Sequence, residues 1–85
     1  MTKTILVILV SKRKDAAGAV QKSLTEYGCI IKTRLGIHDG VANGCSDSGL
    51  ILLELAGAKP KQKALAGALA KISGVTVKTV SLSVK

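Results

Sequence analysis

Four side chains of the types that bind transition metals lie in one short stretch of the sequence. They are His38, Asp39, Cys45 and Asp47. Imidazole nitrogen and thiolate sulfur suit nickel, zinc, copper or iron, so a transition metal such as nickel or zinc is one candidate cofactor. His38 and Cys45 would then be its ligands, and a neighbouring subunit could complete the coordination shell. The alternative is a polar loop without a metal, because no Cys-x-x-Cys or His-x-x-x-His spacing is present.

The same stretch is rich in glycine, which lets backbone N–H groups approach a bound molecule closely. This composition predicts a site for a small molecule or an anion near the junction between a strand and a loop. The alternative is that the glycines only permit turns, since no phosphate-loop motif such as Gly-x-x-x-x-Gly-Lys-Ser occurs. The residues of the predicted ligand site are Gly36, His38, Gly40, Gly44 and Gly49.

Positive charge dominates the polar part of the composition. Lys and Arg number 13 against five Asp and Glu, which gives a formal net charge of +8. Such an excess attracts phosphates, nucleic acid or an acidic protein in a salt-dependent way. The run at 59–63 also coincides with a predicted helix start, where cations are mildly unfavourable, and this indicates attraction of an anion. The alternative is that the basic residues, which are spread along the chain, keep a very apolar protein soluble.

No nucleophile, general base and orienting group occur at a recognisable spacing, so we predict that the chain is not an enzyme. Glu54 lies in an apolar run, where it faces solvent or pairs with a basic residue across a sheet. Its candidate partners are Lys32, Arg34 and Lys78. Tyr27 is the single aromatic residue, which argues against an RNA-stacking surface because such surfaces need aromatic platforms.

Periodicity and turn residues divide the chain into six elements that must position these groups. An unbroken apolar run predicts a strand buried on both faces at Ile5–Val10. Apolar residues at three- and four-residue spacing predict a helix over 12–27, closed by a left-handed Gly28. The remaining elements are strands at Cys29–Ile37, Leu50–Leu55 and Val75–Val84, and a helix that Pro60 begins and Ser73-Gly74 ends.

The order β-α-β-β-α-β is that of the ferredoxin-like fold, in which two helices cover one face of a four-stranded antiparallel sheet. We therefore expect one α+β domain over residues 1–85. The apolar alternation changes phase at Thr79-Val80, which predicts a bulge or a change of partner there. Cys29 opens a strand and is expected to be a small buried residue.

Two cysteines do not make a disulfide framework. The apolar run at 5–10 is too short for a signal peptide and far too short for a membrane span. We therefore expect a soluble cytoplasmic protein with reduced thiols and no membrane partner.

The apolar content exceeds what two helices can cover. The strands at 5–10 and 50–55 are apolar at nearly every position, and hence on both faces of the sheet. Leaving that surface in water forfeits about 25 cal/mol per Å² of apolar area, and monomers rarely expose such patches. We expect the open face to pack against another subunit in a homo-oligomer, either a dimer or a tetramer. The alternative is a monomer whose segment 38–48 folds over the sheet.

The C-terminal third carries two motifs of a known family. Residues 64–80 contain Leu-x-Gly-x-Leu followed by Ile-x-Gly-Val-x-Val-Lys. Arg34-Leu35-Gly36-Ile37 and the apolar run Leu50–Leu55 extend the match. In order and spacing, most of residues 3–82 resembles the iron-only hydrogenase system regulator family.

This resemblance implies an ACT-like domain of the ferredoxin type, similar to the C-terminal regulatory domain of the nickel-responsive repressors. It implies a small regulator associated with hydrogenase assembly, without defined catalysis. The repressors place a His-x-His pair near the end of the equivalent strand and a Cys close behind. His38 resembles the second His and Cys45 resembles the Cys, whereas Gly36 stands where the first His would be.

Two functions follow from these observations. The first is a non-catalytic regulatory domain that oligomerises through its sheet and senses a small ligand or a metal. The alternative is a basic adaptor that binds nucleic acid or an acidic protein partner.

Overall fold

Four strands and two helices follow each other in the predicted order, with a short 3₁₀ turn added. The computed structural model describes residues 1–11, 13–38 and 48–84. In chain order the elements are β1 (Thr2–Val10), α1 (Arg13–Glu26), η1 (Gly28–Ile30), β2 (Ile31–His38), β3 (Gly49–Leu55), α2 (Lys59–Ala70) and β4 (Val75–Ser83). The predicted α+β fold of the ferredoxin type is therefore confirmed.

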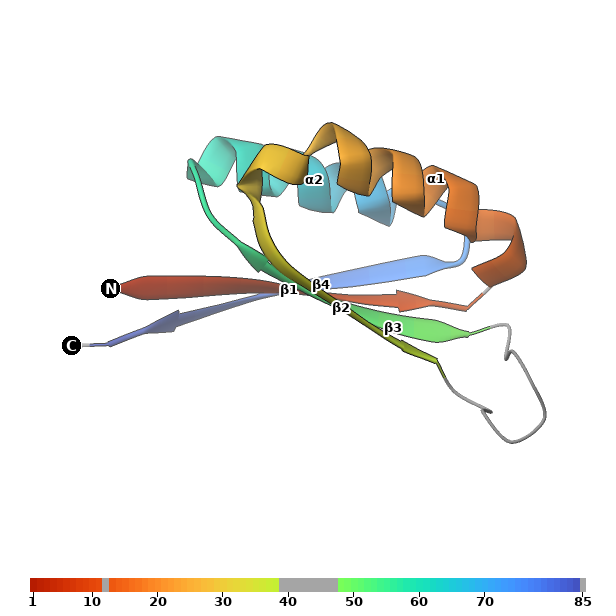
Figure 1. Cartoon of the computed structure of the whole chain (residues 1–85), viewed down its shortest axis with the longest axis horizontal. Coiled ribbons are helices and arrows are strands. Elements are labelled where there is room, and N and C mark those ends of the chain that lie inside the picture. Colours follow the sequence, from red (N-terminus) through yellow and green to blue (C-terminus); the bar gives the residue numbers. More distant parts are fainter. Residues whose placement is uncertain (12, 39–47, 85) are drawn as a thin grey trace.

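The strands form one antiparallel sheet in the order β2-β3-β1-β4, and both helices lie on the same face of it (Figure 1). The central strand β1 pairs with β3 and β4, so that Ile8 lies opposite Ile51 on one side and Val77 on the other. The two chain ends lie side by side, because Val84 donates its N–H to the Met1 carbonyl oxygen at 3.0 Å.

The predicted bulge at Thr79-Val80 is wrong. β4 pairs with β1 in continuous register, and the register shift among the described pairings lies in β2 between Ile31 and Thr33. The phase change in the sequence has another cause. Apolar residues of β4 change face along the strand, from the helix side at Val77 to the opposite side at Val80.

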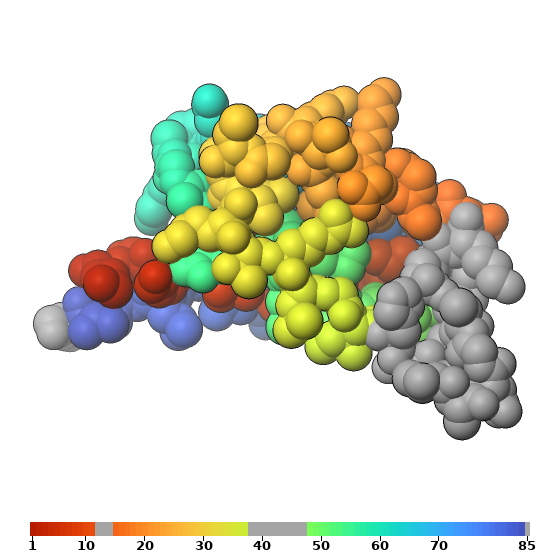
Figure 2. All heavy atoms as spheres, viewed as in Figure 1, coloured from red at the N-terminus to blue at the C-terminus, as the bar shows by residue number. Residues whose placement is uncertain are grey.

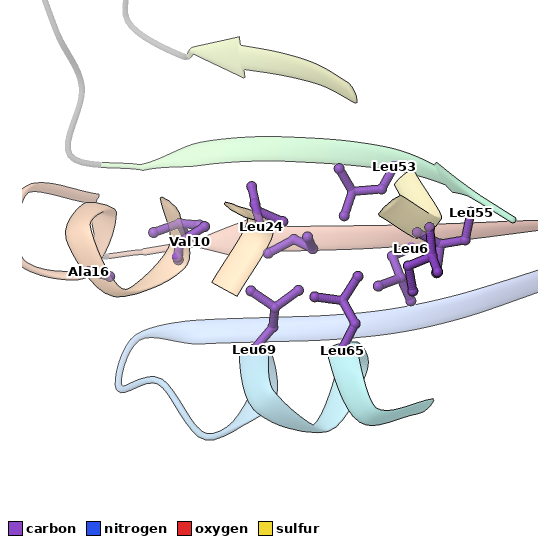
Figure 3. Close-up of a cluster of buried hydrophobic side chains, with 11 residues drawn as sticks. Leu6, Val10, Ala16, Leu24, Leu53, Leu55, Leu65 and Leu69 are labelled. Atoms are coloured by element: carbon purple, nitrogen blue, oxygen red, sulfur yellow. The ribbon is translucent and has the colours of Figure 1, made fainter. Parts of the chain in front are cut away.

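The hydrophobic core fills the layer between the helices and the sheet. Leu6 and Ile8 of β1, Leu53 of β3, and Leu65 and Leu69 of α2 are fully buried. Their spacing explains the packing, since alternate strand residues share a face and helix residues four apart share a side. In Figure 3, the two α2 leucines point from the helix toward the strands. Figure 2 shows the helices packed along one side of the sheet.

Glycines with left-handed backbone close two connections. Gly57 and Gly74 have φ angles of 80° and 81°, and Gly74 lies where the sequence predicted the second helix to end. Gly28 does not have the predicted left-handed conformation, because the 3₁₀ turn η1 continues the chain from α1 directly into β2. Cys29 lies in that turn and is exposed, so its predicted burial is wrong.

The sheet face opposite the helices, called the open face below, is mostly aliphatic, and its polar residues are Lys3, Thr33, Glu54, Thr76 and Lys78. Several of its side chains are well exposed, with Leu35 at 52% and Leu82 at 60%. Its aliphatic residues are Ile5, Val7, Leu9, Leu35, Ile37, Leu50, Leu52, Val80 and Leu82.

Within the described ranges, no helix is long and apolar enough to cross a membrane.

Candidate functional site

A hollow of about 190 Å³ lies beneath α1, where that helix passes over β2 and β3. It is called the α1 hollow below. Two of the glycines predicted to form a ligand site, Gly36 and Gly49, line it. Ile37 of β2 and Leu50 of β3, whose side chains belong to the open face, border it as well.

Gly36 leaves open space at this hollow because it has no side chain. Gly36 lies inside β2 opposite Ile51, and a Cβ placed on it would meet no atom within 4 Å. A glycine inside a strand often marks a place where another group approaches the backbone closely. The helix therefore passes over β2 at this point with no side chain of the strand beneath it.

Arg34 and Gln21 supply the polar groups of the α1 hollow. The Arg34 guanidinium donates a hydrogen bond from Nη2 to Oε1 of Gln21 at 2.9 Å. A guanidinium carries five N–H donors, so most of them stay available to a further acceptor. The remaining walls are aliphatic and include Val10 of β1, Val20 of α1 and Ile51 of β3. An aliphatic hollow with one guanidinium suits a small organic anion with a short hydrocarbon tail.

The predicted metal ligands fall mostly outside the described residues. His38 is the last residue of β2, where it pairs with Gly49. Asp39, Gly40, Gly44, Cys45 and Asp47 lie outside the part of the chain that the structure describes. Within that part, no three His, Cys, Asp or Glu residues come together as a metal site would require. Gly36 also takes the place of the first His of the repressor pattern, so one donor of that set is absent.

Glu54 lies at the polar margin of the open face, where it pairs with two lysines. Its Oε2 atom is 3.1 Å from Lys3 Nζ and 3.8 Å from Lys32 Nζ. The hydrogen bond from Lys3 and the positive charge of that lysine, with a smaller contribution from Lys32, hold the pKa of Glu54 below its usual value. Lys32 was a predicted partner, whereas Lys3 follows from the pairing of β1 with β3, which no local pattern reveals.

Sequence reasoning missed Arg34 and Gln21 as members of a site. Gln21 lies between the buried Val20 and Leu24 of α1. Arg34 was a predicted partner of Glu54 and part of the family motif, but it bonds Gln21 instead. Their contact joins a helix to a strand and depends on tertiary packing. Gly36 was the usable signal. It lies two residues after Arg34 in the same strand, so both residues lie on one face of the sheet, and the missing side chain of the glycine indicates a hollow beside the arginine.

The starts of the two helices lie at opposite ends of the sheet (Figure 1). β1 leads into α1 and β3 leads into α2, and these two strands are antiparallel. The basic run at 59–63 therefore lies far from the start of α1 at Arg13. These positively charged segments do not share one end of the protein.

Comparison with known proteins gives one family and several similar folds. A family model described as "TM1266-like: Iron-only hydrogenase system regulator, putative" matches residues 3–79. The uncharacterised protein TM1266 from Thermotoga maritima is 33% identical, with 98% of this chain and 100% of that chain covered and a TM-score of 0.81. No curated protein matches the chain.

Two further structures share the fold at low identity. The ACT domain of a GTP pyrophosphokinase from Chlorobium tepidum is 16% identical, with 92% of this chain and 96% of that chain covered and a TM-score of 0.70. The PII-like protein CPII from Thiomonas intermedia K12, a structure bound to ADP, AMP and bicarbonate, is 14% identical, with 98% and 92% covered and a TM-score of 0.60. At these identities the likeness establishes an ACT-like fold.

Proposed function

Because the chain belongs to the TM1266-like family of iron-only hydrogenase system regulators, we propose that it is a small non-catalytic regulatory domain. It senses a small ligand in the α1 hollow and assembles into a homo-oligomer through the open face. One observation supports ligand sensing most directly: Arg34 holds its guanidinium at an aliphatic hollow that Gly36 leaves unfilled.

The ligand proposed for the α1 hollow is a short aliphatic carboxylate. A carboxylate accepts two parallel N–H bonds from a guanidinium, a charge-assisted arrangement stronger than the bond from Arg34 to the neutral Gln21. The tail would pack against Val20 and Ile51. The PII-like relative with bound bicarbonate and nucleotides supports the idea that this fold can hold small anions.

Assembly through the open face is supported by its composition. Exposed leucines such as Leu35 and Leu82 make this face far more apolar than the surface of a typical monomer. Its charged side chains lie toward the margin, where Lys3 already neutralises Glu54. An apolar centre with a polar rim is the usual anatomy of a subunit interface. A second copy of the chain offers the same surface, so a two-fold arrangement buries both faces together.

Native mass spectrometry of the purified protein tests both parts of the proposal. We expect the mass of a dimer or tetramer and a bound small molecule that is lost on denaturation. Metal analysis of the same sample tests the alternative cofactor, a transition metal held by His38 and Cys45. A strict monomer without any bound species would contradict the proposed function.

An ¹⁵N-labelled sample gives a site-specific test of the α1 hollow. Isovalerate is a suitable probe, and isopentyl alcohol is its control because it has the same hydrocarbon tail without the charge. We expect saturable shifts of the Gly36 and Gly49 amide signals with the carboxylate and much smaller shifts with the alcohol. Equal shifts with isovalerate and isopentyl alcohol would contradict recognition of the carboxylate by Arg34.

The adaptor alternative rests on the net charge of +8. It receives less support from the arrangement of the chain, because α1 and α2 begin at opposite ends of the sheet. A duplex DNA titration at low and at physiological salt separates the two functions. Binding that weakens steeply with salt would favour the adaptor.

A further inference from the structure

A second hollow, of about 220 Å³, lies between α2 and the strands β1 and β4. It is called the α2 hollow below. Thr4, Thr79 and Ser81 line it from the strands, and Lys59 and Lys63 line it from α2. It shares no lining residue with the α1 hollow. Both hollows lie on the helix side of the sheet, so assembly through the open face leaves the α2 hollow accessible.

The hydroxyl-bearing residues of the α2 hollow come from paired strands. Thr4 lies opposite Ser81 and Leu6 lies opposite Thr79, so the three hydroxyl-bearing residues share the face beneath α2. Thr4 is only 7% exposed as a residue, but the described part of the chain has no buried side-chain oxygen or nitrogen without a hydrogen-bond partner. Because Thr4 lines the hollow, its hydroxyl can donate a hydrogen bond to a molecule that enters there.

The positive charges at the α2 hollow are uncompensated. Lys59 and Lys63 are four residues apart and therefore lie on the same side of α2. Among the described residues, the ion pairs involve Lys3 and Lys32, and neither Lys59 nor Lys63 has a carboxylate partner. The described lining of the hollow contains no acidic side chain either.

The start of α2 adds a second electrostatic reason. The first turn contains no acidic residue, and the N-cap residue Ala58 makes no side-chain cap. The positive end of the helix dipole therefore lies beside two lysines, an arrangement that is unfavourable without an anion. A bound anion would offset both the lysine charges and the dipole.

We propose that the α2 hollow binds a compact phosphate group, either free phosphate or the phosphate of a small metabolite. The lysine ammonium groups supply the charge, and the hydroxyl groups of Thr4, Thr79 and Ser81 donate hydrogen bonds to its oxygens. No aromatic side chain is among the described lining residues, so the recognised group is the phosphate and not a base. This site is independent of the ligand proposed for the α1 hollow.

Titration of the ¹⁵N-labelled protein with inorganic phosphate, at constant ionic strength maintained with chloride, tests the proposal. We expect saturable shifts at the amides of Thr4, Lys63 and Thr79. Lys63→Gln should weaken binding about tenfold, the loss expected for a charged hydrogen bond. Lys61→Gln is the matched control, because it removes the same charge from the same helix at a residue that does not line the hollow.

Thr4→Val tests the Thr4 hydroxyl with a side chain of nearly the same shape. We expect weaker phosphate binding, because one hydrogen-bond donor at the hollow is removed, while the protein stays folded without phosphate. Tighter binding of ribose 5-phosphate than of inorganic phosphate would identify a phosphorylated metabolite as the ligand, and equal binding would identify free phosphate.

Three results would overturn the proposal. The first is a set of shifts that chloride reproduces or that do not saturate. The second is an equal loss of phosphate binding in Lys61→Gln and Lys63→Gln, which would indicate diffuse attraction to a basic surface. The third is unchanged binding in a folded Thr4→Val variant.

Discussion

Arg34 and Gln21 join the edge strand β2 to the helix α1 through one hydrogen bond, from Nη2 to Oε1 at 2.9 Å. Both side chains are exposed and both line the α1 hollow. Because Gln21 is a neutral acceptor, an incoming carboxylate can compete with it for the guanidinium. The pair therefore keeps Arg34 oriented at the hollow while no ligand is bound.

Replacing Arg34 with Gln should abolish the response to isovalerate and leave the fold intact. The charge and the forked donors are lost, whereas the side chain is exposed and contributes little to the core. Arg34→Lys keeps the charge without the planar fork and should still weaken binding about tenfold. Lys32→Gln, a charge change two residues away on the same strand, is the control. Comparable binding by Arg34→Gln and Lys32→Gln would contradict the proposed role.

Replacing Gly36 with Ala should stabilise the protein while filling part of the α1 hollow. Glycine inside a strand is destabilising by roughly 0.5–1 kcal/mol relative to alanine, and the added Cβ meets no atom within 4 Å. Gly67→Ala on α2 should stabilise by a similar amount, because its Cβ is also unobstructed, without affecting the hollow. Urea unfolding measures both changes. Isovalerate binding should fall only in the Gly36 variant, and more with Gly36→Val.

A lysine at Leu35 should break the oligomer. Leu35 is 52% exposed on the open face, so burying a charge there against a second copy is costly. Sedimentation should show a monomer that is still folded, because the side chain lies outside the core. Ala64→Lys, at an exposed position of α2, should keep the wild-type mass. If Leu35→Lys remained an oligomer, the interface would have to lie on another surface.

Replacing Gly57 with Ala should destabilise the protein although the residue is exposed. Gly57 has a φ angle of 80°, which costs a non-glycine residue about 1–2 kcal/mol. An added Cβ would also lie 2.9 Å from Cγ2 of the buried Ile30. A double-mutant cycle with Ile30→Ala separates the two causes, because the single variant Ile30→Ala measures the loss from shortening this core residue and the coupling measures the contact. If Gly57→Ala unfolded at the same temperature as the wild type, neither the backbone strain nor the contact with Ile30 would be supported.

Acidification should weaken the fold through Glu54. Because Lys3 and Lys32 hold its pKa below the usual value, the ion pairs contribute stability above that value. This contribution is lost as the pH falls through the lowered pKa of the folded state. Urea midpoints measured between neutral and acidic pH should therefore fall further in the wild type than in Glu54→Gln. Lys3→Gln should remove more of the difference than Lys32→Gln, whose nitrogen is more distant.

Most of the architecture could be predicted because it depends on local pattern. Alternating and helical spacing placed the buried residues Leu6, Leu24 and Leu65 in the correct elements. It was harder to predict which residues of β2 face the helices. Leu35 and Ile37 are apolar yet lie on the open face, whereas Arg34 faces the helices. An edge strand allows this because a long polar side chain there can reach solvent past α1.

The sites were less predictable because they depend on pairs of elements. Gly36 and Gly49 were predicted to take part in one ligand site, and pairing of β2 with β3 brings both to the α1 hollow. Gln21 and Thr4 carried no local signal, because their importance comes from what passes over or beside them. The open face, in contrast, was foreseeable by comparing the apolar content with the area that two helices can cover.

Ile37 and Leu50 border the α1 hollow and also belong to the open face. In the proposed function, ligand occupancy and subunit association would therefore act on the same short section of β2 and β3. Such coupling is reciprocal. A ligand that strengthens subunit association must bind the oligomer more tightly than the monomer, and one that weakens association must bind the oligomer less tightly. The proposed ligand and the proposed second copy would lie on opposite sides of one sheet, so coupling between them would need no moving domain.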